Sequence, residues 1–193
     1  MCVRFSTNLK DQGSAALGTE LHRLCPQWVS AQVVRHGESV LYVHPQYIRS
    51  FLLFCRDSML YQIKACIDLC CVDYPFREHR FTLVYMLCSV HYNLRLRVKT
   101  RGSELDQALS VTPVYASAGW CEREIWDMFG VGFVGHEDLR RLLTDYGFQG
   151  HPLRKDFPLS GYSEFRYDDS EKRVIEEPLE LTQELRNFKY LGR

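Results

Sequence analysis

The chain has 193 residues, of which 46% are hydrophobic and 25% charged, a composition typical of a folded globular protein and not of a disordered one. Its 24 Lys and Arg residues balance 24 Asp and Glu residues. This neutrality argues against a dedicated nucleic-acid binder or a polybasic membrane binder, because both require an excess of cations. Apolar runs such as residues 51–55 are far shorter than the roughly 18 residues needed to cross a bilayer, and the N-terminus lacks the apolar centre of a secretory signal.

The first predicted elements are a hairpin and a helix. Residues 29–34 and 39–43 are β-prone runs separated by Arg35-His36-Gly37-Glu38, a sequence typical of a hairpin turn. Pro45 suits the first turn of a helix, and apolar residues follow it at helical spacing over about three turns. These residues are Tyr47, Ile48, Phe51, Leu52 and Cys55.

Three strands are predicted next. Residues 61–71 form a β-rich run that ends before Pro75, and residues 81–90 are almost wholly apolar, which predicts a central strand. Residues 94–99 alternate strictly between apolar and basic side chains, so three cations line one face of an antiparallel strand. Such a row would suit an anion or nucleic-acid platform, but a solvated outer face is favoured, because no aromatic residues interleave with the cations to stack bases.

Two helices are predicted after these strands, and together the elements indicate the fold class. Ser103 is expected to cap a short helix, and Ser117 a second one that carries Trp120, Ile125 and Trp126. A hairpin, a helix, further antiparallel strands and then helices describe an α+β domain, in which an antiparallel or mixed sheet has helices on one face.

The chain changes character near residue 143. We divide it into an N-terminal extension at 1–27, whose structure the sequence leaves open, an α+β domain at 28–143 and an extended partner-docking tail at 144–193. The tail has 18 charged residues among its 50 and many aromatic residues without strand or helix periodicity. Disordered linkers are poor in aromatics, so the pattern favours a segment that docks on another protein. The aromatic residues are Tyr146, Phe148, Phe157, Tyr162, Phe165, Tyr167, Phe188 and Tyr190.

The eight cysteines do not form a recognisable ligand set. Most lie in apolar runs, where a free thiol behaves as a small hydrophobic side chain. The segment 66–71 has three thiols but no CxxC pair and no His at ligand spacing, so core packing is favoured over a metal or iron–sulfur site. We expect all eight thiols to be reduced and metal-free. A thiol-based metal or redox protein and a nucleic-acid module remain as alternatives.

Charged residues are densest in the segment 121–143. A catalytic interpretation would pair Glu124 or Asp127 with His136 as an acid and a base. No GxGxxG, GKS, GKT or GxSxG motif accompanies them, so no catalytic, cofactor-binding or metal-binding residue is expected. The charges then form either a solvated helix face or a partner-facing ion-pair network, which spacing alone does not separate. They are Glu122, Arg123, Glu124, Asp127, His136, Asp138, Arg140 and Arg141.

A second charged group lies at 151–162, where Arg154, Lys155 and Asp156 stand between two prolines. Proline removes a backbone donor and disfavours a helical residue before it, so this segment is expected to be extended. Asp156 partly cancels the basic pair, and a docking strap is therefore favoured over a phosphate site.

The stretch 122–178 closely resembles the thirty-kilodalton subunit of respiratory NADH:ubiquinone oxidoreductase, Complex I. The family signature has Glu-Arg-Glu, an acid with two apolar residues, a His, and a basic residue before paired aliphatics. The likeness covers about residues 28–190, and residues 145–162 are similar to the mitochondrial and proteobacterial branch. The signature is matched by Glu122, Arg123, Glu124, Asp127, Met128, Phe129, His136, Arg140, Leu142 and Leu143.

The resemblance implies a core subunit that binds no cofactor and belongs to the peripheral, matrix-side arm of a hetero-oligomer at the mitochondrial inner membrane. FMN, the iron–sulfur clusters and ubiquinone would be bound by other subunits of the complex. The tail would run along the quinone-site subunit, and the charged residues at 122–141 and 154–156 would support contacts with that and other peripheral-arm subunits. The complex transfers electrons from NADH to ubiquinone and translocates protons, while this chain would support its assembly and its quinone-reducing module.

Overall fold

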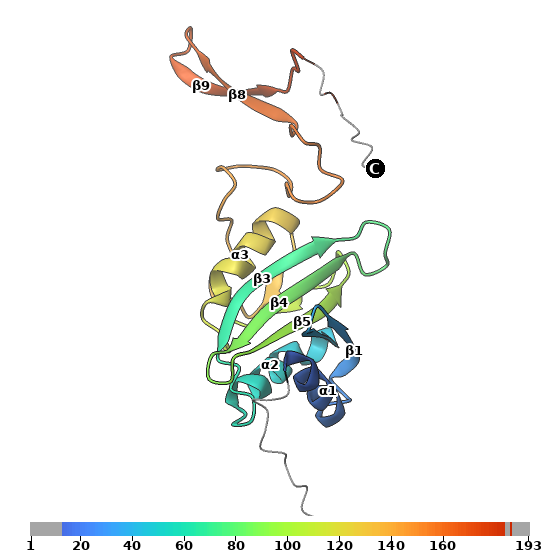
Figure 1. Cartoon of the computed structure of the whole chain (residues 1–193). Coiled ribbons are helices and arrows are strands. Elements are labelled where there is room, and N and C mark those ends of the chain that lie inside the picture. The colour runs from blue at the N-terminus through green and yellow to red at the C-terminus, as the bar shows by residue number, and fades with distance from the viewer. Residues whose placement is uncertain (1–12, 184–185, 187–193) are drawn as a thin grey trace, which may run out of the picture.

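A five-stranded mixed sheet forms the centre of the protein. The computed structural model describes residues 13–183 and Arg186 (Figure 1), so the predictions for Cys2, Phe188 and Tyr190 lie outside the described residues. The strand order is β1-β2-β5-β4-β3, in which β2 runs parallel to β5 and the other pairs are antiparallel. The strands are β1 (Val29–Arg35), β2 (Glu38–Val43), β3 (Ala65–Asp73), β4 (Phe81–Ser89) and β5 (Leu94–Gly102). The predicted α+β class, the hairpin at 29–43 and the inner position of β4 are confirmed.

The three helices of the described chain pack on one face of this sheet. They are α1 (Ser14–Leu24), α2 (Ile48–Asp57), which follows a 3-10 turn at Pro45–Tyr47, and α3 (Ala118–Phe129). Gly18 of α1 lies against the side chain of Ser39, and the ring centroid of Phe129 in α3 lies 6.4 Å from that of Phe81. Strand register pairs Ser39 with Leu96, and Leu96 with Leu87, so Ser39 and Phe81 share a face. In Figure 1, α3 lies behind β3.

The core lies between the sheet and these helices. On β5 the apolar side chains are buried while Arg95 and Arg97 are exposed, which confirms the predicted alternation. Leu17 and Leu21 of α1 are fully buried in the same cluster, so residues before position 28 contribute to the core of the domain.

Two local predictions differ from the structure. The run at 61–71 becomes a strand only from Ala65, because Gln62 adopts a left-handed φ of 44° in the turn that leaves α2. The predicted helix at Ser103 is wrong: the N–H of Ser103 donates to Asp106 Oδ2 at 3.1 Å, and the chain continues into β6 (Ala108–Leu109), which pairs with β7 (Phe133–Val134). The helix after Ser117 is confirmed, although the Ser117 hydroxyl donates to a carbonyl of β3 and does not cap the helix.

The tail contains a hairpin that sequence reasoning did not predict. Strands β8 (Ser163–Asp168) and β9 (Arg173–Pro178) pair with each other and project away from the domain (Figure 1). Before the hairpin, the ring centroid of Phe157 lies 6.0 Å from that of Phe148 and 5.5 Å from that of Tyr162. These three rings of the tail therefore pack against one another within the chain.

Replacing Leu21 with Ala should lower the free energy of unfolding by about 2–5 kcal/mol, because a fully buried leucine leaves a cavity where α1 meets the sheet. Leu24→Ala is the matched control, since Leu24 lies in the same helix but is 44% exposed. Calorimetric or denaturant unfolding of the full chain measures both. Equal effects of the two substitutions would contradict an integral role for α1.

Candidate functional site

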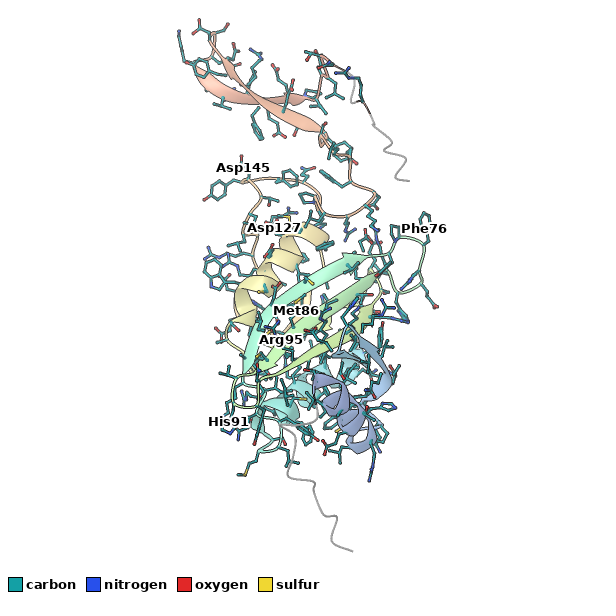
Figure 2. The ribbon with its side chains drawn as sticks, viewed as in Figure 1. Phe76, Met86, His91, Arg95, Asp127 and Asp145 are labelled. Carbon is teal, nitrogen blue, oxygen red and sulfur yellow. The ribbon has the colours of Figure 1, made fainter. Side chains whose placement is uncertain are left out.

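Asp127 ties the beginning of the tail to α3. It is fully buried near the end of the helix (Figure 2), and its two carboxylate oxygens accept five hydrogen bonds. The backbone N–H groups of residues 142–144 donate to Oδ2 at 3.2, 2.7 and 2.8 Å, while the Thr144 hydroxyl and Arg141 donate to Oδ1 at 2.6 and 3.3 Å. Burial disfavours ionisation, but these hydrogen bonds outweigh it and hold the pKa of Asp127 below its ordinary range.

The C-terminal end of α3 is capped by the tail. The carbonyl groups of residues 127–129 lie 3.0, 3.1 and 2.6 Å from hydrogen-bonding nitrogens of His151, Leu153 and Arg154. The Arg154 guanidinium also suits the negative end of the helix dipole. Gly130 has a left-handed φ of 75°, and a Cβ there would lie 2.5 Å from the His151 ring. The segment predicted as a docking strap therefore packs closely on a helix of its own chain.

Glu122 makes a second buried connection from α3. Its Oε1 accepts the N–H of Val111 and its Oε2 accepts the Ser110 hydroxyl, both at 2.7 Å. His136 Nε2 lies 3.9 Å from Oε2. Burial raises the pKa of Glu122, and the hydrogen bonds from Ser110 and Val111 with the nearby His136 offset only part of this effect.

His136 is not paired with either acid of the catalytic interpretation. Asp127 is occupied by residues 141–144, and the Glu124 side chain is exposed. The Nε2 of His136 lies 3.1 Å from the carbonyl oxygen of Gly119, and its Nδ1 accepts a backbone N–H at 3.0 Å. Because both ring nitrogens are engaged and the side chain is only 6% exposed, His136 holds the loop at 136–138 against the start of α3 and is not positioned as a general base.

The remaining signature charges lie nearer the surface. The Arg123 guanidinium donates to the carbonyl oxygens of residues 140 and 141 at 3.3 and 3.4 Å. Asp138 and Arg140 form an exposed pair at 2.8 Å, an arrangement that contributes little to stability. Within the charged cluster, Glu124, Asp138 and Arg140 are the most exposed residues, and the predicted interface role of the cluster stays a prediction.

Sequence reasoning missed the residues that hold the basic segment 154–156. Arg80 donates to both oxygens of the buried Asp73 at 2.8 and 3.0 Å and pairs with Asp156 at 2.9 Å. Asp73 also accepts the N–H of Lys155 at 2.9 Å, a contact that spans 82 residues of sequence. The Arg80 guanidinium and the Lys155 N–H lower the pKa of Asp73 despite its burial. No local pattern signals a contact over this separation, so only the fold reveals it.

Comparison with known proteins identifies the family. Residues 41–163 match the family described as "Respiratory-chain NADH dehydrogenase, 30 Kd subunit", and this range contains the charged segment on α3 and the basic segment at 154–156. The chain belongs to this family. The resemblance noted from the sequence is thus confirmed, and it replaces the thiol-based and nucleic-acid-binding alternatives.

This 30 Kd family member is similar to two relatives and to one solved structure, as follows. "NADH-ubiquinone oxidoreductase subunit 9" of Prototheca wickerhamii is 59% identical over 167 residues, which cover 86% of this chain and 87% of the relative. "Probable NADH-ubiquinone oxidoreductase 30.4 kDa subunit, mitochondrial" of Candida maltosa is 50% identical over 171 residues, which cover 89% of this chain and 62% of the relative. A chain of the membrane-bound sulfane sulfur reductase, an archaeal respiratory membrane complex, has a TM-score of 0.63, 29% identity and coverage of 75% and 85%.

The cysteines of this 30 Kd family member have the character of packing residues. The seven in the described part of the chain are free thiols. Burial raises the pKa of Cys66 to about 11 and that of Cys71 to about 12, so little reactive thiolate forms at neutral pH. In residues 13–183, no group of three potential ligand side chains is arranged to hold a metal ion. The metal-free state of all eight cysteines stays a prediction.

The protein also has a hollow that sequence reasoning did not anticipate. It has a volume of about 510 Å³ and lies between the start of α2, the end of β5 and the segment 103–109. His44, Tyr47 and Arg101 are among its lining residues, and none of the charged cluster on α3 lines it.

Among the described helices, none is long and apolar enough to cross a membrane.

Asp127→Asn should destabilise the turn at 142–144 by about 1–3 kcal/mol, because the amide nitrogen presents donors to N–H groups that need an acceptor. Hydrogen exchange of Leu143 and Thr144 measures the effect, and Asp138→Asn is the exposed control. The native pKa of Asp127 lies below the unfolded value of about 3.9. Its contribution to the stability of the folded protein is therefore present above that pH and is lost as the pH falls through the native pKa. Unchanged exchange in Asp127→Asn would contradict this role.

Glu122→Ala should destabilise the protein by about 1–3 kcal/mol, because it leaves buried donors on Ser110 and Val111 without an acceptor. Glu122→Gln should be tolerated better, since the amide retains one acceptor and the Ser110 hydroxyl can accept from its nitrogen. The native pKa of Glu122 is raised above the unfolded value of about 4.3. Its contribution to the stability of the folded protein is therefore full below that pH and is lost as the pH rises through the native pKa. The free energy of unfolding of the wild type should therefore exceed that of Glu122→Gln by more at pH 4 than at pH 7.

Proposed function

We propose that this chain is an architectural subunit that docks through its tail and binds no redox cofactor itself. As a member of the 30 Kd family, it is a core subunit of the multi-subunit complex that transfers electrons from NADH to ubiquinone. The proposal places it in the mitochondrial, matrix-side peripheral arm, with FMN, the iron–sulfur clusters and ubiquinone on other subunits. The buried charges of α3 support this role, because Glu122 and Asp127 are each engaged by backbone and side-chain groups of the same chain.

The observation that carries the proposal is the exposed apolar face of the β8–β9 hairpin. Register pairs Phe165 with Glu176 and Tyr167 with Val174, so the two rings and Val174 share one face with the carboxylate of Glu176. Phe165, Tyr167 and Val174 are 57%, 56% and 63% exposed. An isolated two-stranded hairpin is at best marginally stable in water. This hairpin is therefore suited to complete its packing on a partner, which we propose to be the quinone-site subunit.

The contacts of residues 141–156 explain how such an arm would be held. Asp127 fixes the start of the tail, Arg154 and its neighbours cap α3, and Asp73 holds the backbone of Lys155. These contacts hold residues 141–156, the root of the tail, on the domain. The partner-binding portion of the tail therefore begins close to Ser163 and not at residue 144. A firmly held root lowers the entropy that docking of the hairpin removes.

Phe165→Ser/Tyr167→Ser should reduce incorporation of the chain into the complex about tenfold or more, because the docking face loses both aromatic anchors. Native gel electrophoresis and NADH:ubiquinone reductase activity per assembled complex measure this. Assembly should fall while the turnover of the complex that still forms stays near the wild-type value.

The matched control is Glu164→Ser/Arg166→Ser, which changes two residues on the opposite face of the same strand. It removes the exposed pair between Arg166 and Glu177, which contributes little, so assembly should be retained. Normal assembly of Phe165→Ser/Tyr167→Ser would refute docking through the hairpin. Normal assembly with a specific loss of quinone reduction would indicate a catalytic role instead.

A further inference from the structure

The second face of the five-stranded sheet carries no helix within the described part of the chain. The helices lie on the side of Ser39 and Phe81, and the neighbouring residues along each strand point to the other side. We call this second side the open face; Met86 and Arg95, labelled in Figure 2, belong to it. The tail leaves from the end of α3 and runs beyond the sheet (Figure 1). The open face therefore has no helix of the described chain over it, although Val40 and Val84 on this face are only 4% and 6% exposed.

The composition of the open face is unusual for a solvated sheet. An antiparallel sheet with one covered face normally alternates apolar and polar side chains. Strand β4 is instead apolar on both faces, a pattern typical of a strand that is buried on both sides. The chain's own helices cover only one of them. The apolar and thiol side chains of the open face include Val40, Tyr42, Val72, Val84, Met86 and Cys88.

Strand β5 adds a row of cations to this apolar surface. Register places Arg97 between Val40 and Met86, and Lys99 between Tyr42 and Val84. The row consists of Arg95, Arg97, Lys99 and Arg101. Lysine and arginine stems cover apolar neighbours while their charged ends remain at the surface.

Most of this positive charge is not balanced within the chain. Arg97 pairs with Glu38 at 2.6 Å, and Arg101 lies over the Tyr42 ring at 5.2 Å. No ion pair is found for Arg95, Lys99 or Arg101 among the described residues. Since the chain as a whole has a net charge of zero, this row is a local excess that an anionic surface would match.

We propose that the open face docks an acidic segment of another protein subunit. Asp and Glu side chains of that segment would meet Arg95, Lys99 and Arg101, while its apolar side chains cover the half-buried Met86 and Cys88. Arginine, methionine and tyrosine are enriched in the centres of protein interfaces, which agrees with the composition of this face.

Charge and shape disfavour two other occupants. A second copy of the chain would bring the same cations against each other, which is repulsive. A single-stranded nucleic acid requires exposed rings for stacking, whereas Tyr42, the aromatic side chain between the cations, is half-buried under Arg101. An acidic protein segment satisfies both the row of cations and the apolar surface between them.

The inference rests on the proposed membership of a larger complex, and it concerns a contact separate from the hairpin. The first experiment treats the purified complex with a water-soluble carbodiimide, which joins an amine directly to a carboxylate in contact with it. Lys99 should be linked to an Asp or Glu of another subunit. The isolated full-length chain and a Lys99→Gln complex are the controls, and neither should yield this linked peptide.

The second experiment reverses charge on the open face. Arg95→Glu/Lys99→Glu should lower incorporation into the complex about tenfold or more, since like charges would then face each other across the contact. Arg23→Glu/Lys64→Glu is the matched control, because both residues are exposed and lie outside the row. Circular dichroism of each isolated chain should match the wild type. Replacing the cross-linked acid of the partner with Lys should restore incorporation of the charge-reversed chain.

Three results would overturn the proposal. One is Lys99 that remains unlinked, or linked only to its own chain, in an assembled complex. Another is wild-type incorporation of Arg95→Glu/Lys99→Glu. The third is Lys99-dependent sedimentation of the full chain with phosphatidylserine vesicles in the absence of an intersubunit link, which would indicate a lipid surface. If the wild-type chain does not enter the complex at all, the proposed function fails and not only the contact at the open face. Failure of this inference and failure of the proposed function are therefore distinguishable.

Discussion

The structure depends on the burial of one carboxylate, that of Asp127. A buried negative charge is stable only where donors surround it, and here the donors come from the turn at 142–144, from the Thr144 hydroxyl and from Arg141. That requirement directs the chain back over the end of α3 as it leaves the domain. The capping of α3 by residues 151–154 and the lock between Asp73 and Lys155 follow from this path.

The features of this subunit that suit assembly are the surfaces that it does not cover itself. Its helices bury one face of the sheet, while the other face remains apolar and positively charged. The hairpin carries Phe165, Tyr167 and Val174 on one face, and each of these side chains is more than half exposed. In a monomeric protein such surfaces favour aggregation, and in a subunit they are the sites at which other chains pack. The neutral net charge agrees with a chain that functions inside an assembly.

Comparison of sequence and structure shows which inferences local patterns permit. The alternation on β5 and the apolar run of β4 predicted their strands, because side-chain periodicity is a local property of the backbone. The family signature identified Glu122 and Asp127 without revealing what they contact. Both acids are satisfied by segments of the same chain, and the bond from Lys155 to Asp73 spans 82 residues. Contacts over such separations leave no periodic trace, and the helix predicted at Ser103 failed because a local Asp106 acceptor and the β6–β7 pair stabilise a different path.

The sequence by itself determined the α+β class, the positions of the main strands along the chain, the last helix and the family, since each is recorded in periodicity or in a contiguous motif. Only the tertiary structure decided that the root of the tail belongs to its own domain, that α1 completes the core, and that one face of the sheet stays uncovered. The first outcome depends on which buried polar groups find partners in space, and the other two depend on which apolar faces meet in the folded chain. A buried carboxylate such as Asp127 selects its donors by geometry, and the distance along the chain has no part in that selection.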